Sequence, residues 1–190
     1  NRLIAITDQL LDFRQTEINK FNLYFERIEI SSLVREVYSD FATLAEQGSI
    51  STTIHLPQQP FFAFVDVDAF QKIVCNLFSN AVKYAASRVD ISLLPPSGLE
   101  ASFTLQVKND GYLIPERLKE KIFEPFYRIK ETEKEAGTGI GLPLARSLAQ
   151  LHNGNIVVKT SDDNQNIFLL SLPIHHETEI NLHRKEKENT

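Results

Sequence analysis

The chain has 190 residues, of which 42% are hydrophobic and 24% charged, and this balance fits one globular domain with a fragment of another. Its 25 acidic and 20 basic residues give a net charge of −5, which argues against a nucleic-acid binder, and its single cysteine excludes an internal disulfide. No apolar run is long enough to span a membrane, and the start at Asn1 with no methionine in the chain leads us to expect a piece of a longer protein.

Residues 1–22 are expected to form the end of a long helix and a linker. Leu10 and Phe13 belong to an apolar seam with spacings of three and four residues, which is too narrow for a globular core. We therefore expect the partner of this helix to lie outside the sequence. The next helix is predicted over 31–47, with Ser31 or Ser32 as its N-cap and Gly48 at its end.

The remaining pattern alternates strands with two further helices. The helices are predicted over 67–85 and 140–152, with a short one from Pro115 to about Lys121 and a charged loop over 129–137. The predicted strands cover 50–56, 61–65, 88–94, 100–108, 155–160 and 166–172. This order predicts a domain over 23–174, an α/β two-layer sandwich whose sheet is mixed and mainly antiparallel, with three main helices on one face. Residues 175–190 are expected to be a polar, frayed tail.

A polar stripe on the 67–85 helix is the first candidate site. Asn76, Asn80 and Lys83 follow one another at helical spacing, so two amides and an ammonium project side by side. An amide oxygen can hold a metal ion and an ammonium can neutralise phosphate, whereas no carboxylate is present to act as a general base. The alternative is an ordinary solvated helix face.

Three further stretches are ambiguous when each is taken alone. Gly137-Thr138-Gly139-Ile140-Gly141-Leu142 precedes a helix, whose free N–H groups suit a phosphate, but it could equally be a flexible lid or turn. Asn109-Asp110-Gly111 is also what a tight turn requires. Phe123 to Arg128 could be an aromatic cluster beneath a loop, or could place an arginine on a phosphate.

The order of these four stretches resembles the catalytic and ATP-binding domain of sensor histidine kinases, in the GHKL superfamily. Asn76-x-x-x-Asn80-Ala-x-Lys83-Tyr84 looks like the N box of that family. Asn109-x-Gly111-x-x-Ile114-Pro115, Phe123-Glu-Pro-Phe126 and Gly137-Thr-Gly139-x-Gly141-Leu142 look like its G1, F and G2 boxes. The resemblance covers about 30–174 and implies a Bergerat-type fold with a sheet of about five strands. Residues 9–18 look like the end of the second helix of the family's dimerisation and phosphoacceptor domain.

The resemblance implies that the domain binds ATP and Mg²⁺ and transfers the γ-phosphoryl group to a histidine on that separate helical domain. Asn80 would bind the metal, Asn76 would lie beside it, and Lys83 and Arg128 would contact phosphate, so that Asn76, Lys83 and Arg128 are the implied catalytic residues. Tyr84, Asn109, Gly111 and Ile114 would meet the adenosine end. Phe126, Gly137, Thr138, Gly139, Ile140, Gly141 and Leu142 would form and anchor the mobile lid.

The resemblance also implies partners and a location. The partners would be the dimerisation domain of the same protein and the receiver domain of a response regulator, in a homodimer of the full-length protein. The parent protein would be a membrane-anchored bacterial sensor with this domain in the cytoplasm, and neither nucleic acid nor membrane would contact this part.

Two positions depart from the family pattern. Asn109 stands where an aspartate normally reads the adenine amino group, and its carbonyl can still accept that hydrogen bond. Leu113 stands where a second glycine is usual. Two alternatives therefore stay open: a degenerate ATP-sensing or scaffolding module without kinase activity, and an anti-sigma-type serine kinase, against which the helical lead-in argues. Asn76 replaces the glutamate that activates water in related ATPases, and an amide cannot be a general base, which favours transfer to a histidine over hydrolysis.

Overall fold

The computed structural model describes residues 2–17, 21–97, 101–132 and 137–175. Its helices are α1 (Arg2–Glu17), α2 (Ile30–Gln47), α3 (Val67–Tyr84) and α4 (Gly141–Leu151), with short 3-10 turns at Glu116–Leu118, Lys121–Phe123 and Lys130–Thr132. Its strands are β1 (Glu26–Glu29), β2 (Ser51–His55), β3 (Phe62–Val65), β4 (Arg88–Leu94), β5 (Ser102–Asn109), β6 (Asn155–Thr160) and β7 (Asn166–Pro173).

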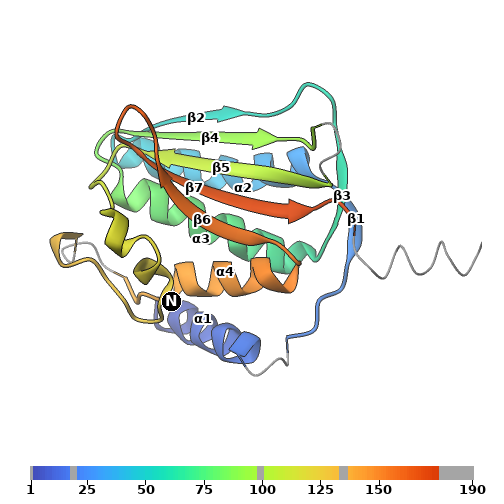
Figure 1. Cartoon of the computed structure of the whole chain (residues 1–190), viewed down its shortest axis with the longest axis horizontal. Helices are drawn as coiled ribbons and strands as arrows, with labels where there is room; N and C mark the ends of the chain where they lie inside the picture. The colour runs from blue at the N-terminus through green and yellow to red at the C-terminus, as the bar shows by residue number, and fades with distance from the viewer. Residues whose placement is uncertain (1, 18–20, 98–100, 133–136, 176–190) are drawn as a thin grey trace, which may run out of the picture.

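Five of the strands form one mixed sheet in the order β2-β4-β5-β7-β6. Only the β2–β4 pair is parallel, and the other three pairs are antiparallel. Helices α2 and α3 lie behind the sheet and α4 lies near its β6 edge (Figure 1). The predicted two-layer α/β architecture is therefore confirmed, including the mainly antiparallel sheet and the helices on one face.

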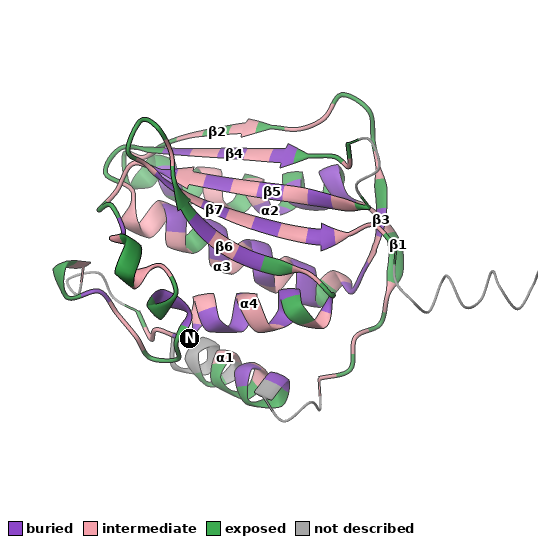
Figure 2. Cartoon of the chain, viewed as in Figure 1, coloured by how far each residue is buried: buried purple, intermediate pink, exposed green. Residues whose placement is uncertain are grey.

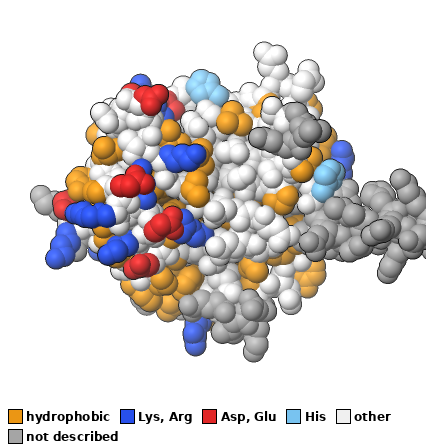
Figure 3. Space-filling model, in the orientation of Figure 1, with side chains coloured by type: hydrophobic (Ala, Val, Ile, Leu, Met, Phe, Trp, Pro, Cys, Tyr) orange, Lys and Arg blue, Asp and Glu red, His pale blue; other side chains and the backbone are white. Residues whose placement is uncertain are grey.

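The core lies between the sheet and these helices. Along β4, β5 and β7 buried and half-buried side chains alternate, as expected for a sheet with one covered face (Figure 2). Phe70, Phe78, Phe103 and Phe168 are fully or almost fully buried there, which makes aromatic packing a large part of the helix–sheet contact. The opposite face carries charged and polar side chains among scattered apolar ones (Figure 3).

Helix α3 is held at its start by an aspartate from the preceding strand end. Asp66 is the N-cap, and its Oδ1 accepts from the Ala69 N–H at 2.8 Å. Its other carboxylate oxygen accepts from the Tyr24 N–H, and its own N–H donates to His152 Nε2 at 3.2 Å. His152, which is 2% exposed, thus joins the end of α4 to the start of α3, in agreement with the structural role that its position predicts.

Two expectations for the N-terminal part were wrong. The N-cap of α2 is Glu29, whose carboxylate accepts from the Ser31 and Ser32 N–H groups, so neither serine caps the helix. The strand β1, which contains Glu29 and pairs antiparallel with β3, was not predicted, because four residues alternating charged and apolar give too short a signal.

Helix α1 packs on α4 within the described part of the chain (Figure 1). Phe13 and Thr16 are both 7% exposed, while Leu10 and Leu11 remain exposed. The seam is therefore divided: Phe13 joins the core, contrary to the expectation that the whole seam meets an outside partner. Among the described residues, no helix has the length and apolarity that crossing a bilayer requires. The predicted tail after His175 lies outside the described residues.

Candidate functional site

A groove lies beside α3 and α4, and its wall along α3 is the polar stripe of that helix. Asn76, Asn80, Lys83 and Tyr84 all line it, one helical turn or less apart. The opposite side of α3 packs into the core through residues such as Phe70 and Phe78. The amphipathic pattern of this helix therefore buries one face and directs the stripe into the groove.

Lys83 is held close to the glycine-rich loop. Its Nζ donates to Tyr84 Oη at 2.8 Å and lies 4.4 Å from the centroid of the Tyr84 ring. A Cβ added at Gly137 would lie 2.5 Å from the same Nζ. The lack of a side chain at Gly137 thus leaves room for the ammonium at the surface of the groove.

The aromatic stretch and the glycine-rich loop meet through their backbones. The Phe126 N–H donates to Gly139 O at 2.9 Å, and both residues have positive φ angles, of 64° and 72°. A Cβ at Gly139 would lie 2.8 Å from the Phe126 backbone, so this contact requires glycine. The phenyl ring of Phe126 itself is 64% exposed and points away from the core.

The start of α4 faces Asn76 across the groove. No side chain caps this helix, whose N-cap is Ile140. The first-turn N–H groups of Gly141 and Leu142 are therefore available to an anion, with the positive end of the helix dipole behind them. A Cβ at Gly141 would lie 2.6 Å from Asn76 Oδ1, and the Asn76 Nδ2 donates to Lys72 O at 2.8 Å, which orients the amide.

The other end of the groove is apolar and contains two buried asparagines. Ile114 and Phe168 line it, together with Asn109 and Asn166, which are 2% and 3% exposed. Asn109 Oδ1 accepts from the Gly111 N–H at 3.2 Å and from Asn166 Nδ2 at 3.3 Å. This end can therefore enclose a flat apolar group that carries a few polar atoms.

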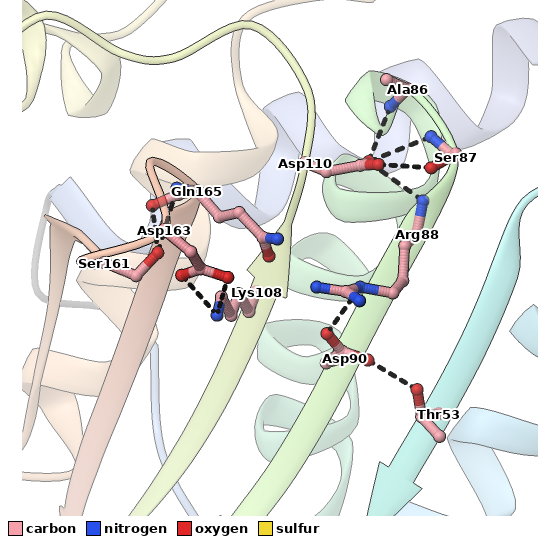
Figure 4. Close-up of polar contacts among 10 residues, drawn as sticks. All are labelled: Thr53, Ala86, Ser87, Arg88, Asp90, Lys108, Asp110, Ser161, Asp163 and Gln165. Atoms are coloured by element: carbon pink, nitrogen blue, oxygen red, sulfur yellow. Dashed lines mark hydrogen bonds and ion pairs between the residues drawn. The ribbon is translucent and has the colours of Figure 1, made fainter.

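Asp110 fixes the turn that brings these two parts together. Its Oδ1 accepts from the N–H groups of Ala86, Ser87 and Arg88 at 2.9–3.0 Å, and its Oδ2 accepts from Ser87 Oγ (Figure 4). Partial burial raises the pKa of this carboxyl, but the hydrogen bonds from residues 86–88 outweigh burial and lower the pKa from 3.8 to about 2. The segment after Tyr84 is thereby tied to the segment before Gly111.

The structure brings most of the predicted site residues to one groove. Those that line it are Asn76, Asn80, Lys83, Tyr84, Asn109, Ile114, Arg128, Gly137, Thr138, Gly139, Gly141 and Leu142. Three others lie outside the lining. Gly111 packs against the Tyr84 carbonyl, Ile140 is buried beneath the loop at 2% exposure, and Phe126 projects into solvent.

Several lining residues were not predicted from the sequence. They include Gln9, Tyr112, Ile122, Tyr127, Asn166 and Phe168. Asn166 opens β7 after a polar turn, where asparagine is common, so nothing in its surroundings indicated a site. Gln9 reaches the groove only because α1 packs on α4, and its Nε2 lies 3.5 Å from Asn76 Oδ1.

The charges in the groove favour an anionic ligand. Among the described residues that line it, Lys83 and Arg128 are cationic and none is acidic. Likewise, the described part of the chain holds no cluster of three His, Cys, Asp or Glu residues that could enclose a metal ion. Asn80, half-buried in the lining, makes no side-chain hydrogen bond with another described residue, so its amide oxygen is free to act as a single ligand of a hard cation that also binds phosphate oxygens.

Comparison with known proteins gives a family match over most of the sheet and both helices that form the groove. The profile described as "Histidine kinase-, DNA gyrase B-, and HSP90-like ATPase" matches residues 65–176. The chain is 30% identical over 189 residues to hybrid signal transduction histidine kinase D of Dictyostelium discoideum and 31% identical over 178 residues to the sensor histidine kinase TmoS of Ectopseudomonas mendocina. These matches cover 96% and 90% of this chain but only 12% and 18% of those relatives, so the chain spans less than a fifth of their length.

Solved structures agree with this match. The catalytic domain of histidine kinase ThkA superposes with a TM-score of 0.70 at 25% identity, covering 82% of this chain and 100% of that domain. Full-length ShkA, solved in complex with AMPPNP, superposes with a TM-score of 0.78 at 20% identity, covering 90% of this chain and 36% of ShkA. The second likeness shows a shared fold.

Proposed function

Because the chain belongs to the histidine kinase-, DNA gyrase B- and HSP90-like ATPase family, as an ATP-binding catalytic domain of the histidine kinase type, we propose that its groove binds ATP together with Mg²⁺ and serves phosphoryl transfer to a histidine on a separate helical domain. One observation carries the proposal. The groove combines two cations, the uncapped start of α4 and the amide of Asn80 at one end with an apolar end closed by buried asparagines, which is the division that a nucleoside triphosphate requires.

Each part of the groove has a role in this proposal. The base lies at the Ile114 and Phe168 end, and the triphosphate extends toward Lys83 and the N–H groups of Gly141 and Leu142. Asn80 holds the metal ion, which, when bound, neutralises charge on the phosphate oxygens. Thr138 and Arg128 lie where the glycine-rich loop meets the triphosphate.

The reaction proposed is an in-line transfer. A nitrogen of the acceptor imidazole forms a bond to the γ-phosphorus, the bond from that phosphorus to the β–γ bridging oxygen breaks, and ADP leaves. The imidazole loses its N–H proton to solvent. Asn76 supplies no general base, and none is required because a neutral imidazole is already nucleophilic. Lys83 stabilises charge that develops on the phosphate oxygens.

The arrangement of the whole protein belongs to the same proposal. Residues 1–22 would continue into the dimerisation and phosphoacceptor domain, residues 23–174 are the catalytic domain and 175–190 a tail. The curated relatives are multidomain kinases, which supports partner domains within the same protein. We further propose a homodimer of the full-length protein, a receiver domain as phosphoryl acceptor downstream, and a cytoplasmic position for this domain beneath a membrane-anchored sensor.

Calorimetry with Mg²⁺-ATP tests the binding step on the chain as it stands. We expect a dissociation constant below about 1 mM, the upper end of common substrate constants. Asn80→Ala should weaken binding more in the presence of Mg²⁺ than in its absence, whereas Asn22→Ala, at an exposed loop position, should leave it unchanged. No heat of binding at millimolar nucleotide would refute the proposal and favour a degenerate module.

Transfer is tested by adding a phosphoacceptor domain and γ-labelled ATP. We expect acid-labile label on a histidine of that domain with the unaltered chain and none with Asn80→Ala. Label that appears equally with Asn80→Ala would refute the metal role of Asn80, and label on serine would refute the acceptor chemistry.

A further inference from the structure

Two buried asparagines form the polar part of the base end, and the backbone fixes the orientation of the first. Asn166 Oδ1 accepts from the Ile114 N–H at 2.9 Å, and Asn166 Nδ2 donates to Tyr112 O at 2.9 Å. A backbone N–H can only donate and a backbone carbonyl can only accept, so exchanging the oxygen and nitrogen of this amide would break both hydrogen bonds. Asn166 must therefore present an N–H to its neighbour in the groove.

That neighbour, Asn109, is oriented in turn. Its Oδ1 accepts from Asn166 Nδ2 at 3.3 Å and from the Gly111 N–H at 3.2 Å. Turning the Asn109 amide over would place its own Nδ2 against two donors, which is unfavourable in a side chain that is only 2% exposed. Both lone pairs of the Asn109 carbonyl are therefore used within the protein.

The Asn109 Nδ2 is the polar atom that remains. Within the described residues no acceptor pairs with it, and Asn109 lines the groove between the apolar side chains of Ile114 and Phe168. An amide nitrogen buried in this way needs an acceptor from a ligand or from water. The base end thus offers a hydrogen-bond donor to whatever lies there.

We propose that Asn109 determines nucleobase specificity by donating from Nδ2 to an acceptor atom of the base, so that this groove does not select for the 6-amino group of adenine. The inference rests on the proposed function, because it requires a nucleotide whose base lies at this end. Adenine presents a donor at its 6-amino group and an acceptor at N1, whereas a 6-oxopurine presents an acceptor at O6. Triphosphates of 6-oxopurines therefore bind about as well as ATP.

The contact from the Asn109 carbonyl to the adenine amine, which the sequence predicts, would compete with Gly111 and Asn166 for the same oxygen. An aspartate at this position would keep both of those hydrogen bonds through one oxygen and offer the second oxygen to the base. Asn109→Asp replaces a donor by an acceptor with almost no change in shape, which makes it the matched variant for the test.

The experiment measures the binding of ATP, of inosine triphosphate, which carries O6, and of purine riboside triphosphate, which has no substituent at position 6. Calorimetry is carried out on the whole chain with Mg²⁺. For the unaltered protein we expect ATP and inosine triphosphate to bind within about threefold of each other, since one neutral hydrogen bond is exchanged for another. Asn109→Asp should shift the ratio at least about tenfold toward ATP. Asn22→Asp carries the same charge change at an exposed position and should leave the ratio unaltered.

The outcomes separate this inference from the proposed function. A preference of more than about tenfold for ATP over both analogues in the unaltered protein, with no further shift in Asn109→Asp, would overturn the inference and leave the ATP site intact. Absence of binding by all three nucleotides would overturn the proposed function and this inference with it. Because the three nucleotides are compared first on the unaltered chain, a variant that fails to fold does not prevent the decision.

Discussion

Replacing Asp110 by asparagine should destabilise the domain at neutral pH and have little effect at low pH. The carboxylate accepts three backbone N–H groups and one hydroxyl from residues 86–88, and these hydrogen bonds outweigh partial burial and lower its pKa from 3.8 to about 2. A pKa difference of this size corresponds to at most about 2 kcal/mol of folding free energy. Since the carboxylate is partly exposed, solvent screening reduces the expected loss in Asp110→Asn to about 1 kcal/mol.

The sign of the pH dependence follows from the lowered pKa. The stabilisation is fully present above the unfolded-state pKa near 4, and it is lost as the pH falls toward about 2, where Asp110 is protonated in the folded state as well. The unaltered chain and Asp110→Asn should therefore differ by about 1 kcal/mol at pH 7 and converge as the pH falls from 4 toward 2.

Urea denaturation followed by far-ultraviolet circular dichroism measures this difference, because the chain contains no tryptophan. Asp162→Asn, in the exposed turn between β6 and β7, makes the same charge change and should alter the free energy of unfolding by less than about 0.5 kcal/mol. A difference between Asp110→Asn and the unaltered chain that is the same at pH 7 and pH 3 would show that the loss is steric and would refute the electrostatic account.

Two other substitutions test the turn and the α2 cap. Gly111→Ala should cost at least about 2 kcal/mol, since the new Cβ would lie 1.7 Å from the Tyr84 carbonyl oxygen, whereas Gly48→Ala, whose Cβ would meet nothing closer than 3.5 Å, should cost less than about 1 kcal/mol. Equal melting temperatures for these two variants would contradict the close approach. Glu29→Ala should cost about 1 kcal/mol in urea denaturation by removing the N-cap of α2, and a loss no larger than that of the exposed Glu36→Ala would show that the cap contributes nothing.

The periodic elements were predictable because a wide apolar face leaves a long signal. Helix α3 was predicted over 67–85 and found over Val67–Tyr84, and β4 and β6 have the predicted bounds. The missed features are short or involve side chains distant in sequence. Glu29 caps α2 from the end of β1, and that strand exists because it pairs with β3.

The candidate site was predictable where its residues fall in one stretch of sequence. Asn76, Asn80 and Lys83 share one helix face, so helical spacing alone places them together. Asn166 lies 57 residues after Asn109 and meets it only because β5 and β7 pair in register, with Asn109 opposite Asn166. Strand pairing of this kind leaves no trace in a single sequence, and the orientation of the Asn109 amide depends on it.

The alternating glycines of the loop before α4 also have a different explanation from the one that the sequence offered. The sequence suggested that Gly137, Gly139 and Gly141 allow the backbone to approach phosphate. In the structure, a Cβ at each would meet a different protein neighbour within 3 Å: Lys83 Nζ, the Phe126 backbone and Asn76 Oδ1 respectively. The repeat therefore reflects close packing of the loop against α3 and the aromatic stretch, and this packing brings the start of α4 to the side chains proposed to bind phosphate and metal.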